Sequence, residues 1–491
     1  MKVKTFYLAM LLAILGSAVH GRAMDAPPTE ADAHMARLFP RPAALEPQIA
    51  FWHAIFAEYS SHQVVLHDAV RLDKVYKVLD FRPHVDAGMS EGELAALERI
   101  ETDLELDRVR ATLLRLHALG PQPASLTADE RHIFELFADD PAPDRFLLAA
   151  DEKRLHSQRG LRERFGDGVR ASRRYLPEME RIFREEGLPP ELTRLPLIES
   201  CFNLRAYSKV GAAGIWQFMP KTGRLFMRVD QLIDERRDPI SSTRAAAQFL
   251  SRVHDQLDSW PLAITAYNHG PDGIARAVDE VGSSDIATII RDYRGKSFGF
   301  ASRNFYAEFL AALDVERDGE RHFGPFPADQ PLHLNERRLE RAVGIEAAAR
   351  LARTDRSEIA ELNPALSPLV VSGRRPIPAG YKLRLPESGG TGFESRLAEF
   401  AAEERVTRVA APAPAASEGR IVRASVPAKT RVAARPTVTT HRVRRGQTLS
   451  HIARAHRVSV QSLKRTNRLG KSTTLRTGQV LKVVRDTQNE T

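Results

Sequence analysis

Residues 195–200 read Leu-Pro-Leu-Ile-Glu-Ser and place one carboxylate, Glu199, at the end of a short apolar segment. Two prolines precede this segment and favour a helix with one apolar face, made of Leu192, Leu195 and Ile198. Apolar neighbours remove hydration from a carboxylate, and a helix C-terminus adds a negative dipole end, so both raise its pKa. Glu199 is therefore a candidate general acid near neutral pH. On local context alone, a glutamate that merely caps or pairs at a helix end is an equal alternative.

A glycine-rich segment follows at 207–220, Tyr-Ser-Lys-Val-Gly-Ala-Ala-Gly-Ile-Trp-Gln-Phe-Met-Pro. Gly211 and Gly214, with two alanines between them, allow close approach of the backbone. The residues after them offer an amide and flat apolar surface that suit a sugar, and they include Trp216, Gln217 and Met219. At least one of the two aromatic rings in this segment is expected in the core.

A third cluster, Ala-Tyr-Asn-His-Gly-Pro at 266–271, predicts a turn that presents polar side chains. Tyr267 and Asn268 suit hydroxyl and acetamido groups. His269 is interpreted as an exposed turn histidine rather than a catalytic one. Cys201, the only cysteine, lacks a nearby basic pair to activate it and is expected to be a small buried hydrophobe.

Together the three clusters resemble the family 1 lytic transglycosylases, whose catalytic domain has a goose-lysozyme-like helical fold. The family carries a Glu-Ser pair, a Ser before a Gly-x-x-Gly-[Leu/Ile]-x-Gln segment, and an Ala-Tyr-Asn segment. Here these are Glu199-Ser200, Ser208 with 211–217, and 266–268, so the resemblance covers about 165–320. Relatives often show Glu-Thr-x-x-Tyr late in the domain, where this chain has Ala-Ser-Arg-Asn-Phe-Tyr at 301–306. Tyr306 is the expected substitute for that phenol.

The resemblance implies a mechanism with one catalytic carboxylate. Glu199 would protonate the bond between N-acetylmuramic acid and N-acetylglucosamine, and the substrate's acetamido group would stabilise C1. Attack by the 6-hydroxyl would then give a 1,6-anhydromuramoyl product. Ser208 and Asn268 would orient the acetamido group, and the sugar subsites would be lined by Gln217, Met219, Tyr267 and Tyr306. No metal or organic cofactor is expected. A hydrolytic muramidase of the same fold and a non-catalytic wall-binding scaffold are the alternatives.

Hydrophobic periodicity predicts a mainly α chain of several domains. Apolar residues recur at three- and four-residue steps from about 51 to 313, with almost no alternating strand pattern. We therefore expect a helical N-terminal region at 24–150 and a compact helical catalytic domain at 151–325. Residues 387–438 are rich in Ala, Pro and Val and predict a flexible linker.

Two small units flank this linker and share one pattern, in which a helix, a Leu-containing helix followed by Asn, and a Gly-x-x-Leu strand follow in order. The pattern predicts a repeated βααβ unit. It resembles LysM modules clearly at 440–484 and in degenerate form at 330–386. LysM modules imply binding to the glycan strands of peptidoglycan.

Charge and the N-terminus indicate where the protein acts. Residues 441–485 hold 12 Lys and Arg and no Asp or Glu, so this module favours a polyanion. Lys2 and Lys4 precede an apolar run, and small residues follow, which predicts a secretory signal at 1–23. Export to the periplasm or cell envelope argues against nucleic acid as the partner. No cysteine lies near the end of the apolar run to carry a lipid. Peripheral membrane association is a further expectation, and a monomer is expected.

Overall fold

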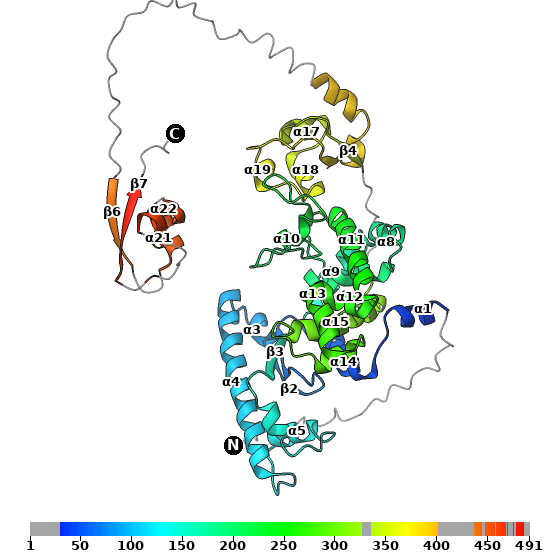
Figure 1. The fold of residues 1–491 in the computed structure, drawn as a ribbon, viewed down its shortest axis with the longest axis vertical. Coiled ribbons are helices and arrows are strands. Elements are labelled where there is room, and N and C mark those ends of the chain that lie inside the picture. Colours follow the sequence, from blue (N-terminus) through cyan, green and yellow to red (C-terminus); the bar gives the residue numbers. More distant parts are fainter. Residues whose placement is uncertain are drawn as a thin grey trace, which may run out of the picture. The chain divides into compact units, whose positions relative to one another are not determined.

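The computed structural model describes residues 30–326, 335–400 and, with short gaps, 437–485. The predicted signal at 1–23 lies outside these residues, as does most of the predicted linker. The chain divides into two compact units, with the boundary after Val406 (Figure 1). No helix among the described residues is both long enough and apolar enough to cross a membrane.

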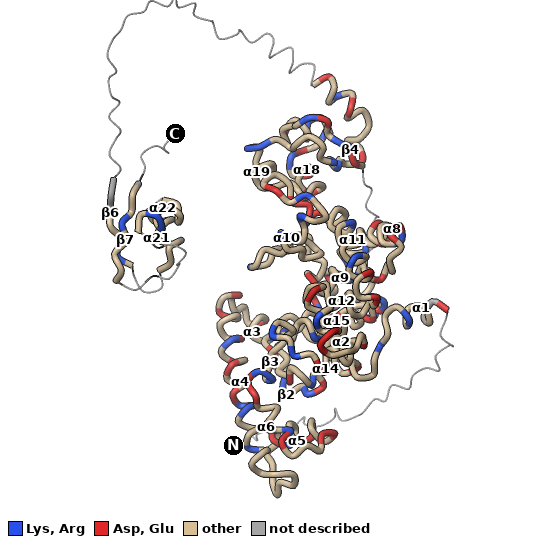
Figure 2. The backbone as a smooth tube through the Cα atoms, in the orientation of Figure 1, with Lys and Arg blue, Asp and Glu red and all other residues tan. Residues whose placement is uncertain are grey.

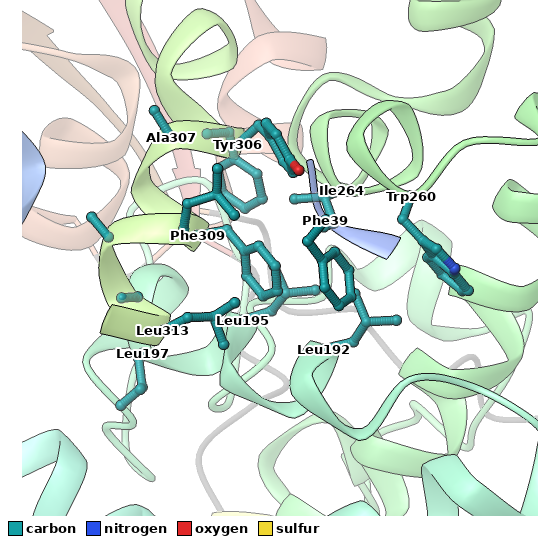
Figure 3. Packing of buried hydrophobic residues seen from close by; sticks show 14 of the residues in the cluster. Phe39, Leu192, Leu195, Leu197, Trp260, Ile264, Tyr306, Ala307, Phe309 and Leu313 are labelled. Atoms are coloured by element: carbon teal, nitrogen blue, oxygen red, sulfur yellow. The ribbon is translucent and has the colours of Figure 1, made fainter. Parts of the chain in front are cut away.

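Helices dominate the first unit, and they share one large core. The prediction of a mainly α protein is confirmed. The helices that surround Glu199 are α7 (Arg162–Ser172), α8 (Leu176–Glu185), α9 (Leu195–Ser200), α11 (Pro239–Leu257), α12 (Trp260–His269) and α15 (Phe300–Arg317). Leu195 and Leu197 of α9 lie beside Phe309 and Leu313 of α15 in this core (Figure 3). The short helix of Glu199 is thus fixed by its apolar face.

The region before residue 150 contributes to the same core. The helix α2 (Glu46–Ala57) packs along α15, and Phe39, Trp52 and Phe56 are buried there. The expected boundary at 150 therefore does not separate two cores, because residues 39–57 complete the core of the helices that follow it.

A three-stranded antiparallel sheet also occurs in the N-terminal region, which the hydrophobic pattern did not predict. Its order is β2 (Val75–Asp80), β1 (Gln63–Asp68), β3 (Leu155–Arg159). The central strand is buried on both faces: Val65 joins the large core, while Val64 and Leu66 face the long helix α4 (Glu91–Leu119). A strand covered on both faces shows no alternation of apolar and polar residues. Acidic and basic residues both lie along α4, as expected of a largely solvated helix (Figure 2).

The middle module folds as predicted into two antiparallel strands around two helices, with a third short helix added. Its elements are β4 (Glu336–Arg338), α17 (Ile345–Leu351), α18 (Arg356–Leu362), α19 (Pro368–Val371) and β5 (Lys382–Arg384). Its core extends past the expected end at 386, because Phe393 is 0% exposed within it. The expected linker therefore starts too early, since the described residues 387–400 pack on the module.

The second unit repeats the plan with β6 (Thr437–Arg442), α21 (Leu449–Ala455), α22 (Val460–Thr466) and β7 (Val480–Arg485). One asparagine makes the same three hydrogen bonds in both modules. Asn363 donates to the carbonyls of Ile359 and Arg384 and accepts from the Arg384 N–H, each at 2.8 Å. Asn467 does the same with Leu463 and Lys482, at 2.7–2.8 Å. This shared asparagine bridge between helix and strand supports the predicted repeat.

Candidate active site

Glu199 lies in the last turn of α9, just before a sharp reversal of the chain. Cys201 and Phe202 both adopt left-handed backbone angles, with φ of 47° and 52°. Left-handed non-glycine residues cost about 1–2 kcal/mol each, so surrounding contacts must hold them. Phe202 is buried, and Gly168 of α7 lies so close that a Cβ there would be 2.5 Å from the Cys201 carbonyl oxygen. The reversal therefore fixes where the carboxylate lies.

Burial raises the pKa of the Glu199 carboxyl to about 8. Among the described residues the carboxyl has neither a hydrogen-bond donor nor a cation beside it, so loss of hydration is the whole cause. At neutral pH the group is therefore mostly protonated. That is the state required of a general acid.

A second carboxyl, Glu308, shares this environment. It lies on α15, which packs against α9, and burial together with the negative charge of Glu199 raises its pKa to about 8 as well. None of the three sequence motifs includes Glu308. The sequence does contain a signal for it, because Glu308 is the only charged residue in the stretch 305–313, Phe-Tyr-Ala-Glu-Phe-Leu-Ala-Ala-Leu.

The glycine-rich segment forms a tight hairpin beside α9. Ser208 closes it: its N–H donates to the Ala212 carbonyl at 2.8 Å, and its Oγ accepts from the Ala212 N–H at 2.9 Å. Gly214 has φ +75°, and a Cβ there would overlap the carbonyl oxygen of Arg236. Gln217 also has positive φ, and its Nε2 donates to the Gly214 carbonyl at 2.7 Å. The close approach predicted for these glycines is thus realised at Gly214.

Hydrogen bonds join the three sequence motifs. The Ser200 Oγ donates to the Ile215 carbonyl at 3.0 Å, which ties the helix of Glu199 to the hairpin. The Tyr267 hydroxyl donates to the Trp216 carbonyl at 2.7 Å, which ties α12 to the same hairpin. Burial and the charge of Glu199 raise the pKa of Tyr267 well above its ordinary value, so this phenol lies near the carboxyl. Trp216 itself is 0% exposed and belongs to the core.

Three further residues of the predicted clusters, Asn268, Met219 and His269, are more exposed than the buried core around them. Asn268 is exposed at the end of α12, and its Oδ1 accepts from the Ser302 hydroxyl at 2.9 Å. Met219 is 42% exposed beyond the hairpin. His269 is half-buried rather than exposed, with Nδ1 3.3 Å from the same Ser302 hydroxyl.

The predicted sugar contact of Tyr306 is wrong. The ring is 0% exposed, and its hydroxyl donates to the Pro40 carbonyl at 2.8 Å. The position of Tyr306 on α15 places its ring inside the core (Figure 3). Burial raises its pKa well above the ordinary value. Tyr306 therefore holds the segment before α2 against α15.

The part of the chain that the structure describes contains no candidate metal site. No group of three or more His, Cys, Asp or Glu side chains lies there in an arrangement that could hold a metal ion. Cys201 is a free thiol, and burial raises its pKa. A raised pKa leaves it as an unreactive thiol.

Comparison with known families identifies two regions. The model of the transglycosylase SLT domain matches residues 180–290, which contain all three motifs, and the model of the LysM domain matches residues 441–484. The chain therefore contains an SLT domain and a C-terminal LysM domain. The predicted resemblance to lytic transglycosylases with LysM modules is confirmed.

Individual relatives agree with this result. The membrane-bound lytic murein transglycosylase D of Escherichia coli K12 is 27% identical over 314 residues, which cover 61% of this chain and 61% of that protein. The lytic transglycosylase Slt of Pseudomonas aeruginosa is 25% identical, covering 31% of this chain and 25% of that chain, with a TM-score of 0.24. The soluble lytic transglycosylase SLT70 of E. coli is 20% identical, covering 31% and 26%, with a TM-score of 0.25. The two structural matches are too partial to carry an argument about this chain.

Proposed function

We propose that this protein is a peptidoglycan lytic transglycosylase of the cell envelope. The observation that carries the proposal is Glu199, a half-buried carboxyl that stays protonated at neutral pH beside the hairpin and Tyr267. The SLT domain match and the similarity to a murein transglycosylase support the same activity.

In this proposal Glu199 acts first as acid and then as base. Its proton passes to the oxygen of the bond between N-acetylmuramic acid and N-acetylglucosamine as the C1–O bond breaks. The substrate's acetamido oxygen stabilises C1, with Ser208 and Asn268 as its orienting residues. The Glu199 carboxylate then takes the proton of the 6-hydroxyl while O6 bonds to C1. The product carries a 1,6-anhydro ring, the acid is restored, and no water is consumed.

The protonation state of Glu308 supports the non-hydrolytic reaction. A retaining or inverting hydrolase uses an ionised second carboxylate as nucleophile or base. Glu308 is the candidate because its carboxyl senses the charge of Glu199, but its pKa of about 8 leaves it mostly neutral at pH 7. A neutral carboxyl is a poor nucleophile and a poor base, so the substrate's own acetamido group takes that role.

A hydrolytic muramidase is the second candidate, and Glu308 is also the observation that favours it. If substrate binding ionised Glu308, its carboxylate could activate a water molecule for attack on C1. The reaction would then consume water and leave a reducing end.

The C-terminal LysM domain would hold the enzyme at the wall. Its charge of 12 basic and no acidic residues over 441–485 would add attraction to an anionic polymer. Tethering raises the local concentration of glycan around the catalytic unit. Export by the predicted signal at 1–23 would bring the chain to the wall.

Product analysis tests the proposal. Purified sacculi are digested with the wild type, Glu199→Gln and the control Glu191→Gln, and the released fragments are analysed by mass spectrometry. We expect 1,6-anhydromuramoyl ends from the wild type and the control and none from Glu199→Gln. Reducing ends would establish the hydrolase instead. Unchanged release by Glu199→Gln would remove Glu199 from the reaction, and no release by the wild type would leave a wall-binding scaffold.

A further inference from the structure

The long helix α4 has a second apolar face, on the side opposite its buried face. Val109 and Leu113 are buried against the rest of the first unit. Three large apolar side chains, Ile100, Leu104 and Leu114, lie on the other side, with exposed fractions of 52%, 51% and 41%. In Figure 1, α4 lies along one edge of the first unit. An exposed apolar face on a helix that is already packed on its other side indicates a surface for a partner.

This exposed face follows the heptad spacing of a coiled coil. Alternate steps of three and four residues define it, and its members are Leu97, Ile100, Leu104, Asp107, Ala111 and Leu114. We call these six residues the α4 seam. Leu97 is half-buried and the other five are exposed. Such spacing over about 27 Å of helix is typical of a helix that packs lengthwise against another helix.

Charges flank the α4 seam in two blocks of opposite sign. Glu101 and Asp103 lie beside its first half, and Arg108 and Arg110 lie beside its second half. Residues seven apart return to the same side of the helix, so each side of the seam carries one acidic and one basic residue.

The flanking charges are available to a partner. Within the described chain, Asp103 and Glu101 form no ion pair. The side chains of Arg108 and Arg110 pair within the chain but stay 71% and 44% exposed. Exposed ion pairs contribute little and exchange partners readily.

A second copy of α4 in antiparallel orientation fits the apolar part of the seam. If the two-fold axis lies midway between Leu104 and Asp107, Leu97 of one copy meets Leu114 of the second copy. Ile100 then meets Ala111, so that a large side chain faces a small one. The symmetry repeats each of these contacts at the other end of the interface.

The same register matches every flanking charge. Asp103 lies opposite Arg110 of the second copy, and Glu101 lies opposite Arg108 of the second copy. Symmetry doubles these two contacts into four ion pairs, and flanking charges of this kind set the orientation of coiled coils. A shift by one heptad brings Asp103 against Asp103 or Arg110 against Arg110. A parallel alignment brings Asp107 against Asp107, so the charges favour one arrangement over its neighbours.

We propose that α4 is a dimerisation helix, whose seam binds the seam of a second copy of this chain in antiparallel orientation. The proposal is independent of the catalytic function and departs from the monomer expected from the sequence. Asp107, the one polar seam residue, faces Leu104 of the second copy, which weakens the contact and makes the dimer reversible. Each dimer carries two C-terminal LysM domains, and two-point attachment to the wall raises avidity.

Sedimentation equilibrium of the full chain over a range of concentrations tests the seam. We expect a reversible dimer for the wild type and at least about tenfold weaker association for Leu104→Glu, which places a charge in the seam. Asp107→Leu should tighten the dimer at least about tenfold, because it replaces the polar residue by an apolar one. The matched control is Leu148→Glu on α6 (Arg145–Ala149), because Leu148 is 50% exposed but lies outside the seam. Its dimer should have the wild-type affinity.

A charge exchange tests the orientation and the register. Asp103→Arg alone and Arg110→Asp alone each place like charges opposite each other twice, so each should weaken the dimer about tenfold. An equimolar mixture of the two variants pairs opposite charges at both places and should regain the wild-type affinity. The chain with both substitutions should regain it as well. Circular dichroism of each variant as a monomer should match the wild type, because the substituted side chains are largely exposed.

Three results would overturn the proposal. The first is a wild-type chain that stays monomeric up to its solubility limit, which would leave the seam for the helix of a different protein. The second is a dimer that Leu104→Glu and Leu148→Glu affect equally, which would place the interface elsewhere. The third is a mixture of Asp103→Arg and Arg110→Asp that associates no better than either variant alone, which would exclude the antiparallel register.

Discussion

Arg384 and Asp238 form an ion pair that is almost completely removed from solvent, with exposed side-chain fractions of 9% and 4%. The Arg384 Nη2 lies 2.9 Å from one carboxylate oxygen, and Glu336 accepts from its Nε at 3.0 Å. The same Asp238 carboxylate caps α11 by accepting from the N–H groups of Ile240 and Ser241. One buried carboxylate thus joins the middle module to a helix that supports the site.

Loss of Arg384 should strongly destabilise the first unit. Arg384→Met leaves Asp238 buried without its cation, and breaking a buried pair from one side costs about 3–5 kcal/mol. Urea unfolding of the full chain measures the change in the free energy of unfolding. The matched control is Arg356→Met, because the Arg356–Glu346 pair is exposed and should change stability by less than about 1 kcal/mol. Equal midpoints for the two variants would mean that the buried pair does not hold the interface.

The contribution of Glu199 and Glu308 to the stability of the first unit should fall as pH rises from about 4.5 to 8. Glu199 and Glu308 have folded pKa values of about 8 against an ordinary value of 4.5, so in this window the folded chain keeps protons that the unfolded chain releases. Each carboxyl contributes a loss of up to about 1.4 kcal/mol per pH unit. Glu199→Gln should therefore gain stability over the wild type as pH rises from 5 to 8. Urea unfolding at both pH values measures the gain, and Glu191→Gln should run parallel to the wild type.

The rate of glycan cleavage should fall above about pH 8. Only the protonated form of Glu199 can donate to the glycosidic oxygen, and that form is present below its pKa and lost above it. We expect kcat/KM to fall about tenfold per pH unit beyond this point. Thermal unfolding at the same pH values separates titration from loss of structure. A decline that begins near pH 5 instead would assign the catalytic step to an ordinary, solvated carboxylate.

Gly214→Ala should damage the hairpin and the activity together. The added Cβ would overlap the Arg236 carbonyl oxygen, and the position also needs a left-handed backbone. Gly211→Ala is a matched comparison, because it shares the positive φ but meets nothing nearer than Pro220 Cγ at 3.9 Å. The left-handed strain alone costs about 1–2 kcal/mol, so Gly214→Ala should exceed this cost and Gly211→Ala should not. Cleavage rates and urea midpoints of both variants provide the comparison, and equal losses would refute steric overlap as the cause.

Tyr306→Phe should change stability without changing substrate affinity. The variant loses the hydrogen bond from the Tyr306 hydroxyl to the carbonyl of the exposed residue Pro40, and such a bond contributes about 0.5–1.5 kcal/mol. KM for glycan strands should stay at the wild-type value, because the ring does not reach the surface. A raised KM with unchanged stability would restore the sugar contact first predicted from the sequence.

The sequence predicted the features whose signals are local. The helical periods, the order of the three motifs and the asparagine repeated in both modules can each be read along the chain, and SLT and LysM matches agree with them. The strand β1 could not be read this way, because its partners in space cover both faces and remove the alternation. Its pairing with β3, far along the chain, leaves no local mark.

The errors within the site have one physical origin. Tyr306 and Glu308 lie on the same helix, two residues apart, and therefore face different directions. Motif spacing selected Tyr306, whereas the crossing of α15 with α9 brings Glu308 to the carboxyl of Glu199. Which side of a helix meets a distant partner depends on tertiary packing, so the sequence alone favoured the wrong residue.

Ile233 belongs by chain position to the SLT domain, yet it is 0% exposed within the core of the middle module and forms a backbone bridge with Leu366. Replacement of residues 336–397 by an unrelated module would expose the Ile233 side chain to solvent. The two segments therefore fold only together, whereas the C-terminal LysM domain belongs to a separate compact unit and can be exchanged without opening this core.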